Sequence, residues 1–291
     1  MQILPALLTP RPIVLAVMLG LATGSVCQAQ SATTETYGSG SDRFTLATGS
    51  PGELGLLKAL AEAFAHEAGA QMIWHKAGTG ASMKLLKERK VDMVMVHAPG
   101  EEQKAVQEGW AMKRTLIGSN EFYILGPEAD PAGIKAASGA ADAYRRVAAN
   151  QAKFVSRGDN SGTHQKEMQV WKAAGIEPRG DWYIVTKDFM TASLKRADAE
   201  GAYFMCDSST WVAEKKNAPK LRILYRGDRF LVNTYHAMAA PAGATPGQAT
   251  AVRFIDLVAG EKGQRIIREF GVERFAEPLY NDSVYAAKYA H

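Results

Sequence analysis

Four short segments of the 291-residue sequence combine glycine, serine and threonine in a pattern that suits anion binding. They are residues 48–52 (TGSPG), 78–82 (GTGAS), 157–164 (RGDNSGTH) and 190–193 (MTAS). Glycine lets backbone amides approach a ligand closely, and the hydroxyl groups add neutral donors. Arg157 is the only Lys or Arg among them, and its planar guanidinium matches two oxygens of a tetrahedral oxyanion. The pattern predicts a site for a compact anion held by many hydrogen bonds.

Each segment alone has a simpler interpretation, because serine and threonine often cap helices. Four such segments on one chain, one of them with an arginine, favour an anion site. Asp159 does not fit this scheme directly. A carboxylate facing the ligand would repel a fully deprotonated anion and favour a protonated phosphate. We expect Asp159 instead to cap the following helix or to pair with Arg157.

Other chemistry has weaker support in the sequence. No phosphate-binding loop of the G-x-x-x-x-G-K-[ST] type occurs, and Gly78-Thr79-Gly80 is followed by Met83 where a dinucleotide fingerprint needs glycine. The histidines show no zinc-binding spacing, so neither a metal nor another cofactor is expected. Ser161 and His164 leave a periplasmic serine hydrolase as a remote alternative. Their proximity in sequence is not triad geometry, however, and the G-x-S-x-G elbow is absent.

Alternating strand and helix patterns surround these segments and predict an α/β fold with mainly parallel sheets. The predicted strands are 44–47, 71–75, 91–97, 121–126, 153–156, 182–186, 202–205, 221–225 and 235–240. The predicted helices are 53–67, 81–89, 101–109, 138–149, 163–174, 191–200, 208–215, 246–259 and 261–270. Ligands of such sheets lie at the carboxyl ends of strands, where the four segments fall.

The amino terminus has the layout of a secretory signal peptide. Residues 13–27 carry no charge, Arg11 precedes them, and Cys27-Gln28-Ala29 leads into polar sequence. We therefore expect cleavage after Ala29, with residues 1–29 as the signal peptide, an exported periplasmic protein, and residues 30–42 as a flexible leader. The net charge of +4 is spread without a run of five like charges, so no nucleic acid partner is expected.

From Phe44 to about Tyr280 the chain resembles the periplasmic substrate-binding proteins of tungstate ABC importers, which have a type II periplasmic binding protein fold. The motifs that carry the resemblance occur in the family's order and cover most of the chain. They are residues 46–48 (LAT), 55–57 (GLL), 77–80 (AGTG), 94–99 (VMVHAP), 126–134 (GPEADPAGI), 154–164 (FVSRGDNSGTH), 182–183 (WY) and 201–203 (GAY).

The resemblance implies two α/β lobes joined by two crossing strands around a central ligand cleft. Lobe 1 would hold residues 43–127 and 236–291, and lobe 2 would hold residues 128–235. The crossings would lie near residues 121–131 and 227–240. The implied ligand-binding residues are Thr48, Ser50, Thr79, Arg157, Ser161, Gly162 and Thr163, with Thr191 and Ala192 contributing backbone amides.

Two departures from the family pattern fall at this implied site. The first turn, residues 48–57, is one residue shorter than the family's Thr-Thr-Thr-Ser-Thr version and lacks several hydroxyls. The family's later Gly-Met-Gly-Ala reads Phe189-Met190-Thr191-Ala192 here, so Thr191 replaces a glycine.

The resemblance implies a non-enzymatic receptor that captures tungstate, or molybdate, and delivers it to an ABC transporter permease as a monomer. The departures leave the same fold with phosphate, sulfate or a small organic anion as the alternative.

Overall fold

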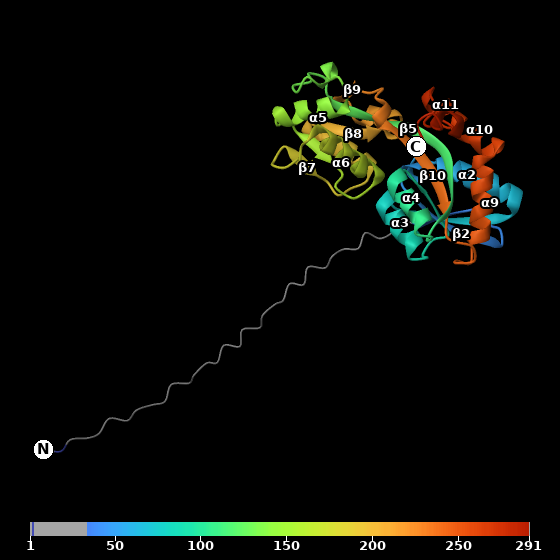
Figure 1. Ribbon diagram of the computed structural model, residues 1–291. Helices are drawn as coiled ribbons and strands as arrows, with labels where there is room; N and C mark the ends of the chain where they lie inside the picture. Colours follow the sequence, from blue (N-terminus) through green and yellow to red (C-terminus); the bar gives the residue numbers. More distant parts are fainter. Residues whose placement is uncertain (1, 3–33, 291) are drawn as a thin grey trace. The chain divides into compact units, whose positions relative to one another are not determined.

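The computed structural model describes residue 2 and residues 34–290 (Figure 1). The expected signal peptide therefore lies outside the described residues, apart from Gln2. Residues 32–291 form one compact unit and are considered by themselves below. Every predicted strand and helix has a counterpart there. Its strands are β1 (Thr34–Tyr37), β2 (Asp42–Thr48), β3 (Ala70–Lys76), β4 (Met93–Val96), β5 (Met112–Pro127), β6 (Phe154–Ser156), β7 (Tyr183–Val185), β8 (Tyr203–Asp207), β9 (Leu221–Tyr225) and β10 (Val232–Ala239).

The helices cover the faces of the sheet. They are α1 (Ser50–Glu53), α2 (Leu56–Ala68), α3 (Thr79–Lys87), α4 (Pro99–Gln107), α5 (Ala140–Ala149), α6 (Gly162–Ala174), α7 (Met190–Glu200), α8 (Ser208–Glu214), α9 (Gln248–Ala259), α10 (Glu261–Glu269), α11 (Val272–Phe275) and α12 (Ser283–Ala286). In α2, Leu57, Leu60 and Phe64 point into the core, as their helical spacing predicts. No helix of the described residues is long and apolar enough to cross a membrane.

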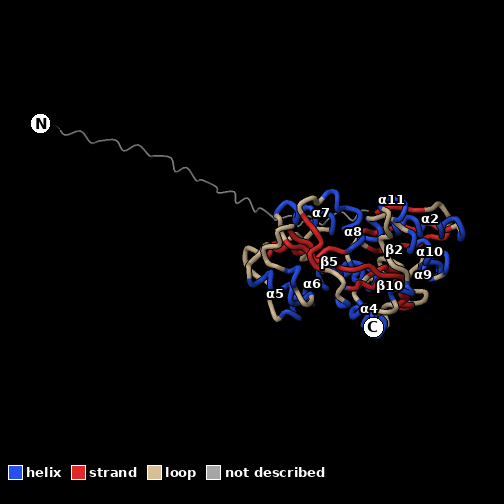
Figure 2. Tube along the Cα trace, turned by 90° about the horizontal axis from the view of Figure 1, so that it is seen from above, coloured by secondary structure: helices blue, strands red, loops and turns tan. Residues whose placement is uncertain are grey.

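Strand β5 joins the two halves of the sheet, whose order is β1-β3-β2-β4-β10-β5-β8-β6-β7 with β9 also paired to β5. The red path of β5 in Figure 2 runs from the β10 side to the α5 and α6 side. Residues 112–121 of β5 pair with β10, and residues 122–125 pair with β8. The predicted strand 121–126 is therefore too short, because its upstream part is polar and its strand partner lies more than a hundred residues away.

The sheet is mixed rather than mainly parallel. Of the nine strand pairings among the described residues, four are parallel and five antiparallel. The parallel pairs are β2 with β3 and β4, and β6 with β7 and β8. The antiparallel ones arise because β5 and β10 cross between the halves and because β1 and β9 add outer pairings. The carboxyl ends of β2, β3, β6 and β7 still lead into the turns that carry the candidate residues.

The prediction of a flexible leader over residues 30–42 is wrong for residues 34–37. This segment forms β1 and pairs antiparallel with residues 72–75 of β3. Backbone hydrogen bonds to a sheet edge need no buried side chains, so a polar segment rich in threonine can form an outer strand. Only Tyr37 of this strand packs against the core, as a half-buried side chain.

The hydrophobic cores also fall into two halves. Two clusters draw on residues 44–117 and 235–280 together with Val212, and the other two draw on residues 122–231. In the second half Tyr144, Phe154 and Trp171 pack their rings within 5.2 Å of one another, centroid to centroid. This arrangement follows the two-lobed architecture, while the lobe boundaries at residues 127 and 235 stay a prediction.

Candidate functional site

A small cavity lies where turns of both halves meet. It is lined by the turn between β2 and α1, the start of α3, the residue after β4, the segment between β6 and α6, and the residue before α7. These lining residues are Thr48, Gly49, Ser50, Pro51, Glu53, Gly78, Thr79, His97, Arg157, Ser161 and Phe189. Three of these five segments are among those predicted from the sequence. Phe189 lies one residue before the predicted segment 190–193, and the residue after β4 was not predicted.

Five of the nine implied ligand-binding residues line this cavity: Thr48, Ser50, Thr79, Arg157 and Ser161. Gly162 and Thr163 follow Ser161 in the first turn of α6; they are buried and do not line the cavity. Thr191 is half-buried and Ala192 is exposed in the first turn of α7, and neither lines the cavity. Phe189, at the N-cap of that helix, occupies this side instead.

Arg157 is buried and held by two hydrogen bonds. Its Nε donates to the Asp188 carbonyl at 3.1 Å, and its Nη2 donates to the Asp159 carboxylate at 2.6 Å. The other oxygen of Asp159 accepts the backbone N–H of Ser161 at 3.1 Å. Asp159 therefore pairs with Arg157, as expected, and also holds the turn that leads into α6. No bond to Nη1 occurs within the described residues, so this nitrogen is available to a ligand.

The charges around the cavity nearly balance. Glu53 on its wall forms an ion pair with Lys76 at 2.8 Å, and Lys76 lies 4.3 Å from the centroid of the Phe189 ring. The Arg157 guanidinium lies 5.9 Å from the same ring. Because Asp159 and Glu53 offset the two cations, attraction for an anion must come largely from neutral donors and helix N-termini.

The hydroxyl of Thr48 is used in a hydrogen bond within the protein. It donates to the Met95 carbonyl at 2.8 Å, while the Thr48 carbonyl accepts Trp74 Nε1 at 3.0 Å. A hydroxyl has one proton to donate, so in this conformation Thr48 cannot donate it to a ligand. The contribution of the first turn falls to Ser50 and the backbone amides around Gly49.

Helix α6 presents its N-terminus beside the cavity. Ser161 is its N-cap, and its Oγ accepts the backbone N–H of His164 at 3.3 Å. The amides of the first turn have no partner four residues back, so they carry the partial positive charge of the helix end. Gly78, the N-cap of α3, lies against this turn: a Cβ added there would be 3.3 Å from the Ser161 Cβ. Two helix N-termini therefore converge on the cavity from opposite halves.

His97 is the functional candidate that the sequence analysis missed. It follows β4 and lines the cavity, but the turn around it has none of the glycine and hydroxyl residues used as the signal. The position directly after a buried strand was the available clue. Burial lowers the pKa of His97 to about 4, with the nearby Arg157 acting in the same direction, so its imidazole is neutral at pH 7.

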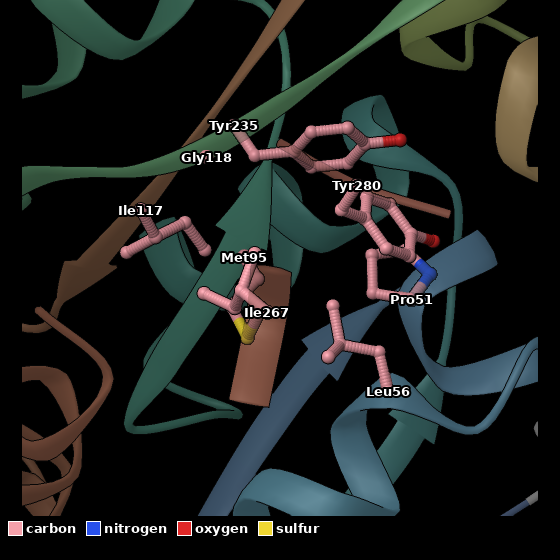
Figure 3. Close-up of a pocket in the computed structure, with 8 residues that line it drawn as sticks. All are labelled: Pro51, Leu56, Met95, Ile117, Gly118, Tyr235, Ile267 and Tyr280. Atoms are coloured by element: carbon pink, nitrogen blue, oxygen red, sulfur yellow. The ribbon is translucent and has the colours of Figure 1, made fainter. Parts of the chain in front are cut away.

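A small apolar cavity lies next to the first turn (Figure 3). It is lined by Pro51, Leu56, Met95, Ile117, Gly118, Tyr235, Ile267 and Tyr280. Pro51 borders both cavities, and the Tyr235 ring packs on His97 at a centroid distance of 4.8 Å. The apolar wall suits packing rather than anion binding. Through Pro51 and Tyr235, this apolar wall packs against the first turn and the His97 ring.

Ser161 and His164 are not arranged as a serine hydrolase requires. His164 Nδ1 accepts the backbone N–H of Asn160 at 3.0 Å, and Ser161 Oγ accepts the backbone N–H of His164. The two side chains make no hydrogen bond with each other, so no base is placed to activate the Ser161 hydroxyl. Within residues 34–290, no group of three or more His, Cys, Asp or Glu could hold a metal ion.

Glu167 on α6 is a buried carboxyl behind the site. It accepts hydrogen bonds from the Tyr183 hydroxyl at 2.6 Å and from Trp171 Nε1 at 3.1 Å. Burial nevertheless raises the pKa of Glu167 to about 7. Since the unfolded pKa is near 4.5, the folded protein keeps a proton between these values that the unfolded chain releases.

We therefore expect the stability contributed by this proton to be present at low pH and lost as pH rises from about 4.5 to 7. The free energy of unfolding of the wild type should fall by on the order of 2 kcal/mol between about pH 5 and pH 8, and that of Glu167→Gln should not show this fall. Urea unfolding at both pH values measures it. The matched control is Glu177→Gln, because Glu177 is exposed. Equal pH dependence in the wild type and Glu167→Gln would contradict the prediction.

Comparison with known proteins agrees with this geometry. A family model described as "PBP superfamily domain" matches residues 29–262. The chain belongs to the PBP superfamily. Two relatives are a protein named "Putative ABC transporter anion-binding protein" from Haloferax volcanii and the tungstate-binding protein TupA of Peptoclostridium acidaminophilum. The first is 34% identical, with 87% of this chain and 79% of its own covered. The second is 31% identical, and the match covers 80% of this chain and 82% of the relative.

Solved structures of the PBP superfamily show the same fold. A tungstate ABC transporter structure from Geobacter sulfurreducens has a TM-score of 0.71 and 36% identity, and covers 80% of this chain and 100% of its own. The tungstate-binding protein TupA of Desulfovibrio alaskensis has a TM-score of 0.68 and 34% identity, and covers 82% and 98%. The predicted family and two-lobed fold are thereby confirmed. The two relatives and the Desulfovibrio protein are named as binding proteins.

Proposed function

We propose that this protein captures tungstate, or molybdate, in the cavity around Arg157 and delivers it to an ABC transporter permease. The observation that carries the proposal is the convergence of Arg157 with the N-termini of α3 and α6 at one small cavity. Neutral donors and one buried cation are what a tetrahedral oxyanion needs. Relatives of the same fold are named for tungstate, which favours this anion.

The proposed site uses Ser50, Thr79, Arg157 and Ser161 as cavity-lining contacts and the amides of Gly162 and Thr163 as helix-terminal donors. Thr48 shapes the first turn. Thr191 and Ala192 would contribute only after a movement of the α7 N-terminus. The protein would act in the periplasm as a monomer of two lobes, 43–127 with 236–291 and 128–235, after removal of residues 1–29.

Phosphate is the second candidate, favoured by the shortened first turn and by the neutral imidazole of His97 on the cavity wall. An acceptor at this position suits an anion that carries a proton. Sulfate and fully deprotonated tungstate carry no such proton at neutral pH.

Calorimetric titration of the exported protein with tungstate, molybdate, sulfate and phosphate tests the proposal. We expect binding of tungstate or molybdate at micromolar or lower concentrations and much weaker binding of sulfate and phosphate. Preferential binding of phosphate would transfer the function to the second candidate. Absence of binding by all four anions would refute an inorganic oxyanion receptor.

A further inference from the structure

His97 stands at one end of a chain of buried hydrogen bonds. Its Nδ1 lies 2.9 Å from Oδ1 of Asn233 on β10. Nδ2 of Asn233 lies 2.7 Å from Oδ1 of Asn120 on β5, and Nδ2 of Asn120 lies 3.2 Å from the carboxylate of Asp207 at the end of β8. The chain thus runs from the cavity through both crossing strands into the second half of the molecule.

Asp207 fixes the direction of every bond in this chain. Its carboxylate already accepts the Thr210 N–H and the hydroxyls of Ser209 and Thr210, so it acts only as an acceptor. Asn120 must therefore turn its NH₂ toward Asp207 and its oxygen toward Asn233. Asn233 must in turn direct its oxygen toward His97. It follows that His97 Nδ1 carries a hydrogen and donates it to Asn233.

This assignment leaves Nε2 as the ring nitrogen without a hydrogen, in a side chain that lines the cavity. Nε2 has no hydrogen-bond partner among residues 34–290. The ring is held in place between Tyr235 and Gly162, where an added Cβ would lie 2.3 Å from Cε1. In the neutral imidazole Nε2 bears a lone pair, because the single proton is on Nδ1. A lone pair facing an oxyanion oxygen is repulsive, so a proton must enter between them.

The groups around His97 allow it to become charged when an anion arrives. Asp207 and Glu102 favour the imidazolium, whereas burial and Arg157 oppose it. Tyr235, whose ring packs against His97, stays neutral because burial raises its pKa far above the ordinary value. A dianion in the cavity would add a strong favourable interaction with the imidazolium and offset the effect of Arg157.

We propose that His97 Nε2 contacts the bound oxyanion and that one proton is taken up with each tungstate and shared between Nε2 and a tungstate oxygen. The inference rests on the proposed function, since it concerns the same cavity. The proton comes from solvent and no covalent bond is broken within the protein. His97 is thus a ligand-contacting residue that links occupancy to pH and joins the ligand to both crossing strands.

Calorimetric titration with sodium tungstate in two buffers of different ionisation enthalpy counts the protons taken up. For one linked proton we expect an uptake of about one per tungstate near neutral pH. The dissociation constant should rise about tenfold per pH unit above the pKa of about 4 of the free His97, for as long as the bound His97 keeps its proton. Nitrogen NMR of the wild type should show Nε2 changing from an unprotonated to a protonated shift when tungstate is added.

His97→Gln removes the titrating group, so its residual binding should lose the pH dependence and the proton uptake. The matched control is His164→Gln, because the His164 side chain bonds to the Asn160 backbone outside the cavity and should leave uptake unchanged. Tungstate binding without proton uptake, or an unprotonated Nε2 in the complex, would overturn this inference and leave the proposed function standing. Failure of the wild type to bind any oxyanion would instead refute the proposed function.

Discussion

Replacing Arg157 by alanine should weaken tungstate binding by about 3 kcal/mol, which is a factor of more than a hundred in the dissociation constant. Arg157 is 4% exposed and carries the one cation that directly lines the cavity among the described residues. Its loss removes a charge-assisted hydrogen bond from a site with little access to water. It also leaves Asp159 without its partner, and an uncompensated carboxylate repels the anion. Isothermal calorimetry on the wild type and the variant measures the change.

Two further variants separate these contributions. Arg157→Ala combined with Asp159→Ala should recover part of the affinity, because the unpaired carboxylate is gone. Arg196→Ala is the charge-matched control: Arg196 is exposed and pairs with Glu200 on the same helix, so binding should not change. An affinity unchanged by Arg157→Ala, in a protein with wild-type circular dichroism, would exclude Arg157 from the ligand site.

Replacing Gly162 by alanine should damage both stability and binding. The new Cβ would lie 2.3 to 2.6 Å from three atoms of the His97 ring, so the ring or the first turn of α6 has to move. Forcing a methyl group into such a packed contact costs about 3 kcal/mol in the free energy of unfolding. Displacement of α6 also misplaces the amides expected to hold the oxyanion, so affinity should fall roughly tenfold or more. Urea unfolding and calorimetric titration measure the two effects.

Gly100→Ala is the matched control for this substitution. Gly100 lies in the first turn of α4, and a Cβ added there would meet nothing within 4 Å. It should therefore leave stability and affinity nearly unchanged. If Gly162→Ala behaved like Gly100→Ala, the close contact between α6 and the His97 ring could not hold in solution, and the support for His97 as a ligand contact would be lost.

Much of the fold was predictable because its signals are local. Hydrophobic periodicity located α2 and the other helices, and short apolar runs located the strands. The role of β1 was not predictable, because a polar edge strand is defined by backbone bonds to β3 and not by its own side chains. The length of β5 was missed for a similar reason: its two partners, β10 and β8, are distant in sequence.

The residue types at the turns were enough to predict the chemical character of the site. Glycine, serine and threonine at strand-to-helix turns, with Arg157 among them, specify donors for an anion wherever the turns are placed. Tertiary structure alone decided which of these groups are free to bind. It assigns the Thr48 hydroxyl to Met95, replaces Thr191 and Ala192 by Phe189 at the cavity, and brings in His97. The physical reason is that a donor's availability depends on its partners, and these partners come from segments far apart in the chain.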